Sequence, residues 1–164
     1  MKFKPKTNQE IIDLAAGINS AGNDKKNAKF SMLIARIKYA LKDIVAPIDE
    51  AAEAPEVIND LAREKNELFI KYATAAEDGK TKVPDDKWPE FMAEIEDMKK
   101  KYQQVEDDYG VQMKSHRKLL KEQPKDENDK DLVINLVEIP ESLIPNTLTG
   151  NQIEAIMPVI KFKG

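Results

Sequence analysis

The sequence predicts an α+β fold that is mostly α: an antiparallel bundle of three to four helices with a small terminal β-sheet. Apolar residues recur at intervals of three and four along most of the chain, as they do on one face of a helix. Thr-x-x-Glu and Thr-x-x-Gln pairs stand where helices should begin, and a β-branched run near the C-terminus is typical of a strand. The length of 164 residues suits one domain, so we treat 1–164 as a single helical-bundle domain.

The N-terminal part of the chain predicts two amphipathic helices. Thr7 and Glu10 form a capping box, so a first helix should run from about 8 to 20. A second apolar series with helical spacing covers 30–48. Pro47 lacks an amide proton and disfavours a helical residue before it, so this second helix should end or kink just before that proline.

A third helix should extend to about Ala76, and a turn-rich connection over 77–84 should lead into a fourth helix that starts near Trp88. The fourth helix is the longest and carries a coiled-coil-like seam at heptad positions a and d. All but a Gln and a His in this seam are apolar or aromatic. The seam consists of Trp88, Phe91, Ile95, Met98, Tyr102, Val105, Tyr109, Gln112, His116 and Leu119.

The last part of the chain has a different texture. A charged loop should span 123–131, and 132–164 should form a strand–helix–strand segment that packs on the bundle. Within it, Thr149 and Gln152 form a second capping box ahead of a short helix. The small sheet is expected to combine 1–4, 132–139 and 159–163.

Large apolar side chains of the second to fourth helices should form the core, each contributing about 1.5–3 kcal/mol when fully buried. Replacing Ile95 in the seam with Asp should therefore unfold the protein. The expected core residues are Ile37, Leu41, Ile44, Leu61, Leu68, Phe91, Ile95, Met98, Tyr102 and Val105.

Composition argues against several classes of function. Without cysteine there is no thiolate metal site and no cysteine nucleophile, and the single histidine, His116, has no neighbouring carboxylate along its helix. The six glycines are scattered and form no phosphate-binding loop, and the acidic run 126–131 lacks the central Gly of a calcium loop. We expect no enzyme activity, no cofactor and no metal. A carboxylate- or metal-dependent hydrolase is the weaker alternative.

The remaining candidates are surfaces for a protein partner. Trp88 and Tyr109 are aromatic residues of the long helix, which serve either the core or a partner's groove. Lys114, Arg117 and Lys118 place positive charge on one side of a helix end, where the plain interpretation is interaction with the helix dipole. The segment 139–145 is apolar and bounded by prolines, so it could lie extended across a partner or cross the bundle itself. Its central pair, Leu143 and Ile144, completes the expected partner-binding set.

The order of features is similar to that of small uncharacterised accessory proteins of tailed bacteriophages. The resemblance covers about the last 110 residues, and its most specific piece is the Thr-Gly-Asn-Gln-Ile-Glu-Ala-Ile-Met-Pro block at 149–158. It implies phage origin and an accessory role in the infected cell or the particle. It carries no catalytic motif, so it assigns no site residue.

These observations lead to two hypotheses. The first is a non-enzymatic, phage-encoded protein-binding protein that inhibits or adapts a host or phage protein in the host cytoplasm. The alternative is a structural or assembly component of the phage particle, in which copies of the chain associate as a homo-oligomer. The net charge of −4 makes nucleic acid a poor partner, and no run of apolar residues is long enough for a membrane span.

Overall fold

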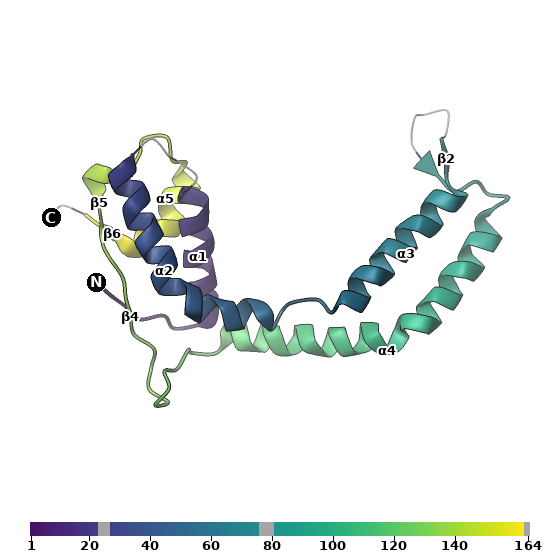
Figure 1. Cartoon of the computed structure of the whole chain (residues 1–164), viewed down its shortest axis with the longest axis horizontal. Coiled ribbons are helices and arrows are strands. Elements are labelled where there is room, and N and C mark those ends of the chain that lie inside the picture. The colour runs from purple at the N-terminus through teal and green to yellow at the C-terminus, as the bar shows by residue number, and fades with distance from the viewer. Residues whose placement is uncertain (23–26, 76–80, 163–164) are drawn as a thin grey trace. The chain divides into compact units, whose positions relative to one another are not determined.

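The computed structural model describes residues 1–22, 27–75 and 81–162 (Figure 1). These residues form a mostly α-helical α+β protein, which confirms the predicted fold class. The chain groups into two compact units: Met1–Ala51 with Ser115–Gly164, and Ala52–Lys114. The expected single domain stays a prediction, because compactness is not a measure of independent folding.

The elements follow one another in this order: β1 (Lys2–Phe3), α1 (Asn8–Ala21), α2 (Ala28–Glu50), α3 (Glu56–Tyr72), β2 (Thr74–Ala75), β3 (Thr81–Lys82), α4 (Trp88–Lys121), β4 (Ile134–Asn135), β5 (Ile139–Pro140), the 3-10 helix η1 (Glu141–Leu143), α5 (Gly150–Ile156), the 3-10 helix η2 (Met157–Val159) and β6 (Ile160–Lys161).

Both predicted capping residues begin their helices. The Thr7 hydroxyl accepts a hydrogen bond from the Glu10 amide at the start of α1. At α5, the Thr149 hydroxyl accepts from the Gln152 amide while the Gln152 side chain accepts from the Thr149 amide, which is the complete capping box. Each cap satisfies amides that the first helical turn leaves unpaired.

Of the two alternatives predicted at Pro47, an end of the second helix is wrong, and a kink stays a prediction. Helix α2 continues through Pro47 to Glu50, and the Ala51 amide still donates to the Pro47 carbonyl at 3.2 Å. A proline removes only its own amide from the hydrogen-bond ladder. Here the carbonyl that loses its partner belongs to the exposed Asp43, where water can replace the missing donor.

The chain ends pair with the segment 132–139 and the residues just after it, but they do not form one sheet. Strand β1 pairs antiparallel with β4, and β5 pairs parallel with β6, so two separate two-stranded sheets replace the single expected one. Lys163, at the end of the predicted last strand, lies outside the described residues.

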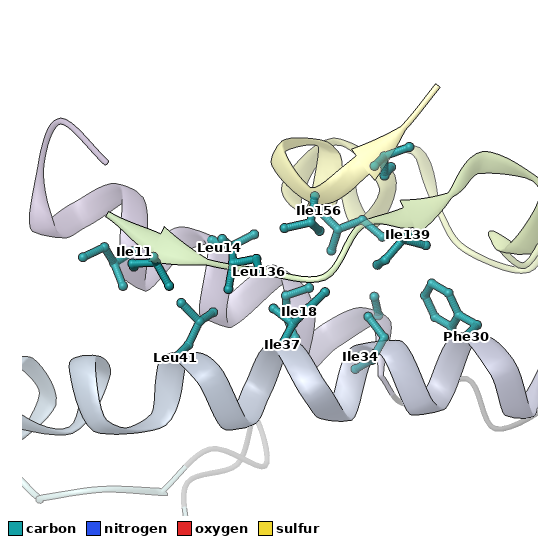
Figure 2. Close-up of a cluster of buried hydrophobic side chains, with 14 of the residues drawn as sticks. Ile11, Leu14, Ile18, Phe30, Ile34, Ile37, Leu41, Leu136, Ile139 and Ile156 are labelled. Carbon is teal, nitrogen blue, oxygen red and sulfur yellow. The ribbon is translucent and has the colours of Figure 1, made fainter. Parts of the chain in front are cut away.

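The main core of the first unit is formed by α1, α2 and the C-terminal segment. Figure 2 shows Phe30, Ile34 and Ile37 of α2 pointing toward Leu136 and Ile139 from the C-terminal segment. The predicted core included residues of α2 but missed every contribution from α1 and from the C-terminal segment. The buried residues missed in these two regions are Ile11, Leu14, Ile18, Ala21, Ile134, Leu136, Ile139, Leu148, Ile156, Val159 and Ile160, and Phe30 and Ile34 of α2 were missed as well.

Helix α5 packs closely on α1 at a glycine. A Cβ atom placed on Gly17 would lie 2.6 Å from the Ala155 Cβ and 2.9 Å from the Ala155 carbonyl oxygen. Real Cβ atoms do not approach each other at that distance, so the two helices are this close only because position 17 has no side chain.

The second unit is a hairpin of α3 and the part of α4 up to Lys114. Helix α3 ends at Tyr72 rather than near Ala76, because Ala73 is already extended and a short β2–β3 pair follows. Residues 76–80 of the predicted turn-rich connection lie outside the described residues.

The hairpin core is small. One cluster consists of Leu68, Val83 and Phe91, with four partly buried neighbours, Tyr72, Met92, Ile95 and Met98, and Leu61 and Tyr102 are the other buried apolar residues described in this unit. Four residues predicted to be fully buried are only half-buried: Ile44, Ile95, Met98 and Val105. The unfolding of the whole protein by Ile95→Asp stays a prediction. Because Ile95 is half-buried, we expect this substitution to disrupt the hairpin first.

The charged loop at 123–131 is closed by its own side chains. Lys125 Nζ lies 2.7 Å from Asp131 Oδ1, and Asp126 Oδ1 accepts hydrogen bonds from the Asn128 and Lys130 amides. Asp129 has a φ of 59°, a left-handed conformation that Asp tolerates better than most residues. The acidic side chains thus fold a tight turn.

Candidate protein-binding site

Two similar side-chain clusters join α3 to α4. In the first, Tyr72 Oη donates to Glu94 Oε1 at 2.6 Å, and Lys71 Nζ donates to the two oxygens of the same carboxylate at 2.7 and 2.9 Å. The Lys71 ammonium also lies 4.9 Å from the centroid of the Tyr72 ring. Two consecutive residues of α3 therefore hold one carboxylate of α4.

The second cluster repeats this arrangement with the helices exchanged. Tyr102 Oη donates to Glu64 Oε1 at 2.5 Å, and Lys101 Nζ donates to the two oxygens of Glu64 at 3.1 and 3.2 Å. Lys101 Nζ lies 4.7 Å from the centroid of the Tyr102 ring. We refer to these two clusters as the Lys-Tyr clamps.

The clamps have a sequence signal that was missed. A Glu-x6-Lys-Tyr pattern occurs at 64–72 and again at 94–102. Seven or eight residues are two helical turns, so the Glu and the Lys-Tyr pair of each helix lie on one face. Each Glu meets the Lys-Tyr pair of the opposite helix, and only an antiparallel pairing in this register forms both clamps.

The clamps perturb the pKa of their members. The hydrogen bond from Tyr102 and then that from its neighbouring lysine lower the pKa of Glu64. Lys71, followed by its neighbouring tyrosine, lowers the pKa of Glu94, and the Glu94 carboxylate raises the pKa of Lys71 in return. Hydrogen bonding to the charged forms is the main cause in each case.

Acidification should weaken the hairpin through these carboxylates. Both have a folded-state pKa below the ordinary 4.5, so their stabilisation is complete above that pH and is lost as the pH falls through the lowered values. We expect Glu64→Gln/Glu94→Gln to reduce the thermal midpoint at neutral pH. The same variant should lose less stability than the wild type between about pH 6 and 2. Circular dichroism at 222 nm follows both.

The control for this experiment is Glu67→Gln/Glu96→Gln, which changes one exposed glutamate in each helix. It should keep the wild-type acid sensitivity. If both double variants respond to acid in the same way, the clamps do not stabilise the hairpin.

A hollow of about 340 Å³ opens between α3 and α4. An ion pair between Lys65 and Glu106, 3.0 Å apart, lies on its rim. Tyr109 lines the hollow, and a Cβ on the adjacent Gly110 would meet nothing within 4 Å. The lining residues are Ile58, Leu61, Ala62, Lys65, Glu106, Tyr109 and Gly110. The hollow is mainly apolar and is open to a side chain from outside.

The hairpin also leaves large apolar side chains in solvent. Ile70 is 65% exposed, Val111 is 62% exposed, and Trp88 is 50% exposed although its ring centroid lies 5.6 Å from that of Phe91, with the rings tilted by 44°. A two-helix hairpin has one interhelical seam, so apolar residues on its other faces have no core of their own to enter. The exposed set in this unit is Val57, Phe69, Ile70, Trp88 and Val111.

The residues expected to bind a partner are divided between the two units. Trp88, Tyr109 and Lys114 belong to the hairpin, with Trp88 and Lys114 exposed and Tyr109 half-buried in the hollow. Arg117 and Lys118 are exposed residues of the first unit.

Leu143 and Ile144 also belong to the first unit and are half-buried. Ile144 packs against the main core. The Leu143 carbonyl accepts a hydrogen bond from the side chain of Asn27, the residue that caps α2. The structure thus uses both residues of this pair in intramolecular contacts, and their role in partner binding stays a prediction.

Within residues 1–22, 27–75 and 81–162, no three or more His, Asp or Glu side chains come together as potential ligands of a metal ion. His116 is a half-buried residue of α4. In the same part of the chain, no helix combines the length and the apolar character needed to cross a bilayer.

Comparisons with protein-family models, curated proteins and solved structures give no match to this chain. The resemblance to phage accessory proteins therefore stays a prediction, and function has to be inferred from the surfaces of the chain itself.

Proposed function

We propose that this chain is a non-enzymatic, phage-encoded protein-binding protein that attaches to a host or phage protein through the α3–α4 hairpin and blocks or adapts it. The exposure of Ile70, Val111 and Trp88 on a hairpin that also holds an apolar hollow is the observation that carries this proposal. Apolar surface left in solvent is a feature of sites that bind other proteins. Aromatic residues such as Trp88 are also enriched among the contacts that dominate binding energy.

The charges of the hairpin favour a protein over a nucleic acid. Lys65, Lys71 and Lys101 each pair with a carboxylate of the opposite helix. Binding to a phosphate backbone depends on cations that are free to replace counterions. Lysines already paired within the hairpin contribute little to such a surface.

A photo-cross-linking experiment tests the proposed surface. Benzoylphenylalanine is placed at Ile70 or Val111, and at the exposed Gln103 of the same hairpin as the control. The purified chain is irradiated in an extract of the cells that naturally contain it. We expect one defined protein adduct from positions 70 and 111 and none from position 103.

Competition makes the result specific. Excess unlabelled wild-type chain should abolish the adduct, whereas Ile70→Asp/Val111→Asp should not, and the adduct should re-form with the purified partner. Both substituted residues are exposed, so this variant should keep its helical content. Labelling that is equal at all three positions, or competition by the double variant, would contradict the proposal.

The alternative function, a structural or assembly component of a phage particle, is favoured by the length of α4. Its 34 residues correspond to a helix of about 51 Å, which can serve as a long packing surface between copies. This alternative predicts a defined homo-oligomer in light scattering and the chain in purified particles by mass spectrometry. The adaptor proposal predicts neither.

A further inference from the structure

A second surface lies on the first unit, where α1 and α2 border a groove of about 300 Å³. Ile18 and Leu41 form a closed apolar floor, because both are almost fully buried. Ala15, Val45 and Ala46 are half-buried and present small apolar side chains along the groove. The polar lining residues, all exposed, are Asn19, Lys38, Lys42 and Asp49.

The basic side chains of α2 differ from those of the hairpin in their ion pairing. Over 28–42, α2 carries Lys29, Arg36, Lys38 and Lys42 and no acidic residue. None of the ion pairs found among the described residues involves any of these four, whereas three lysines of the hairpin pair across its helices. The charged side chains in the N-terminal two-thirds of α2 are therefore all positive, in a protein whose net charge is −4.

Two of these basic residues, Lys38 and Lys42, line the groove itself. Lys38 and Lys42 are four residues apart on the same side of α2, a like-charge spacing that destabilises a helix. An acidic group from a partner placed between them would relieve this repulsion. Asp49, at the other end of the groove, gives it an opposite charge there. The groove thus has positive charge at one end and negative charge at the other.

The dimensions of the groove suit a short helix. Lys38 and Asp49 are eleven residues apart, which on one helix corresponds to about 16.5 Å or three turns. Two packed helices with small residues along their shared groove can accept a third helix at normal packing distance. An amphipathic helix would place its apolar stripe on Ala15, Val45 and Ala46, and its flanking charges would meet the rim.

We infer that the α1–α2 groove binds an acidic amphipathic helix of a protein partner. The apolar stripe of that helix lies on the small residues of the groove, and its carboxylates pair with Lys38 and Lys42. This site belongs to the first unit and uses none of the hairpin residues, so it can fail or succeed independently of the proposed function of the hairpin.

Fluorescence anisotropy with a designed peptide tests the inference. The probe is a labelled helical peptide of about 18 residues, long enough to form a stable helix, with Leu on one face and Glu on the others. A second peptide has Lys in place of every Glu. We expect the Glu peptide to bind at least about tenfold more tightly than the Lys peptide, and its affinity to fall as salt is added.

Three variants test whether the Glu peptide binds in the α1–α2 groove. Lys38→Glu/Lys42→Glu should weaken binding of the Glu peptide by at least about tenfold. Lys99→Glu/Lys121→Glu makes the same change in charge at two exposed positions of α4, outside the expected partner-binding set, and it should leave binding unchanged. Ala46→Trp, which fills the groove and keeps all charges, should also weaken binding. Circular dichroism confirms that each variant is folded.

Three results would overturn the inference. The first is equal affinity for the Glu and Lys peptides, or no binding of either. The second is an equal loss in the control pair at 99 and 121, which would show a general effect of charge. The third is tighter groove-dependent binding of single-stranded DNA than of the Glu peptide, which would identify the cations as a nucleic-acid surface.

Discussion

Replacing Phe30 with Ala is expected to lower the free energy of unfolding of the first unit by about 3–5 kcal/mol. The Phe30 ring is 0% exposed and lies in the first turn of α2, within the core that α1 and the C-terminal segment share. Removal of the ring leaves a cavity between elements far apart in the sequence, which cannot all move to fill it. Chemical denaturation followed by circular dichroism measures the loss.

Phe69→Ala is the matched control. Phe69 lies on α3 and is 36% exposed, so the same change should cost about 1 kcal/mol or less. If the two substitutions destabilise the protein equally, Phe30 does not occupy the closed core described here.

Replacing Gly17 with Leu should separate α5 from α1 and destabilise the first unit by about 2–3 kcal/mol. The added Cβ would overlap the Ala155 Cβ at 2.6 Å and its backbone carbonyl oxygen at 2.9 Å. A backbone atom cannot rotate out of the way as a flexible side chain can, so α5 has to shift as a whole. Hydrogen exchange should show faster exchange in α5 together with the lower stability.

Gly110→Leu is the control for the same chemical change in a helix. A Cβ at Gly110 meets nothing within 4 Å, so the substitution should raise stability by about 1 kcal/mol through the lower entropy of the unfolded chain. A loss of stability at both glycines would mean that the effect comes from local helix geometry and not from α5.

Local signals in the sequence predicted the helices well. The Thr7 and Thr149 caps and the start of α4 at Trp88 were correct because capping and helix propensity depend on neighbours in the chain. Pro47 was given too much weight as a helix end, since the penalty of a proline is only a few kcal/mol and the burial of Ile48 favours continuation of the helix.

The core was harder to predict, because burial depends on which elements meet. Ile139 and Val159 are 0% exposed, yet their apolar character was equally compatible with a strand of one larger sheet. The close contact of Gly17 with α5 leaves no signal in the sequence at all, because a glycine in a helix has several explanations.

The candidate site was predicted only in part. Trp88 and Tyr109 were singled out as aromatic residues of the long helix, and the structure places Trp88 in solvent and Tyr109 in the hollow. The Lys-Tyr clamps were missed because the seam pattern considers apolar residues alone. The groove between α1 and α2 could not be predicted, because its prediction depends on which faces of the two helices meet. The charges along α2 do not contain that information.

The second unit is an insertion: the chain of the first unit stops at Ala51 and resumes at Ser115. Seven residues are close to two helical turns, so deleting seven residues from each of its two helices would keep the same faces together and shorten the pair by about 10.5 Å. The main core of the first unit contains no residue between those two points. Evolution or a protein engineer can therefore change the length of the hairpin in steps of seven residues per helix without altering the core of the first unit.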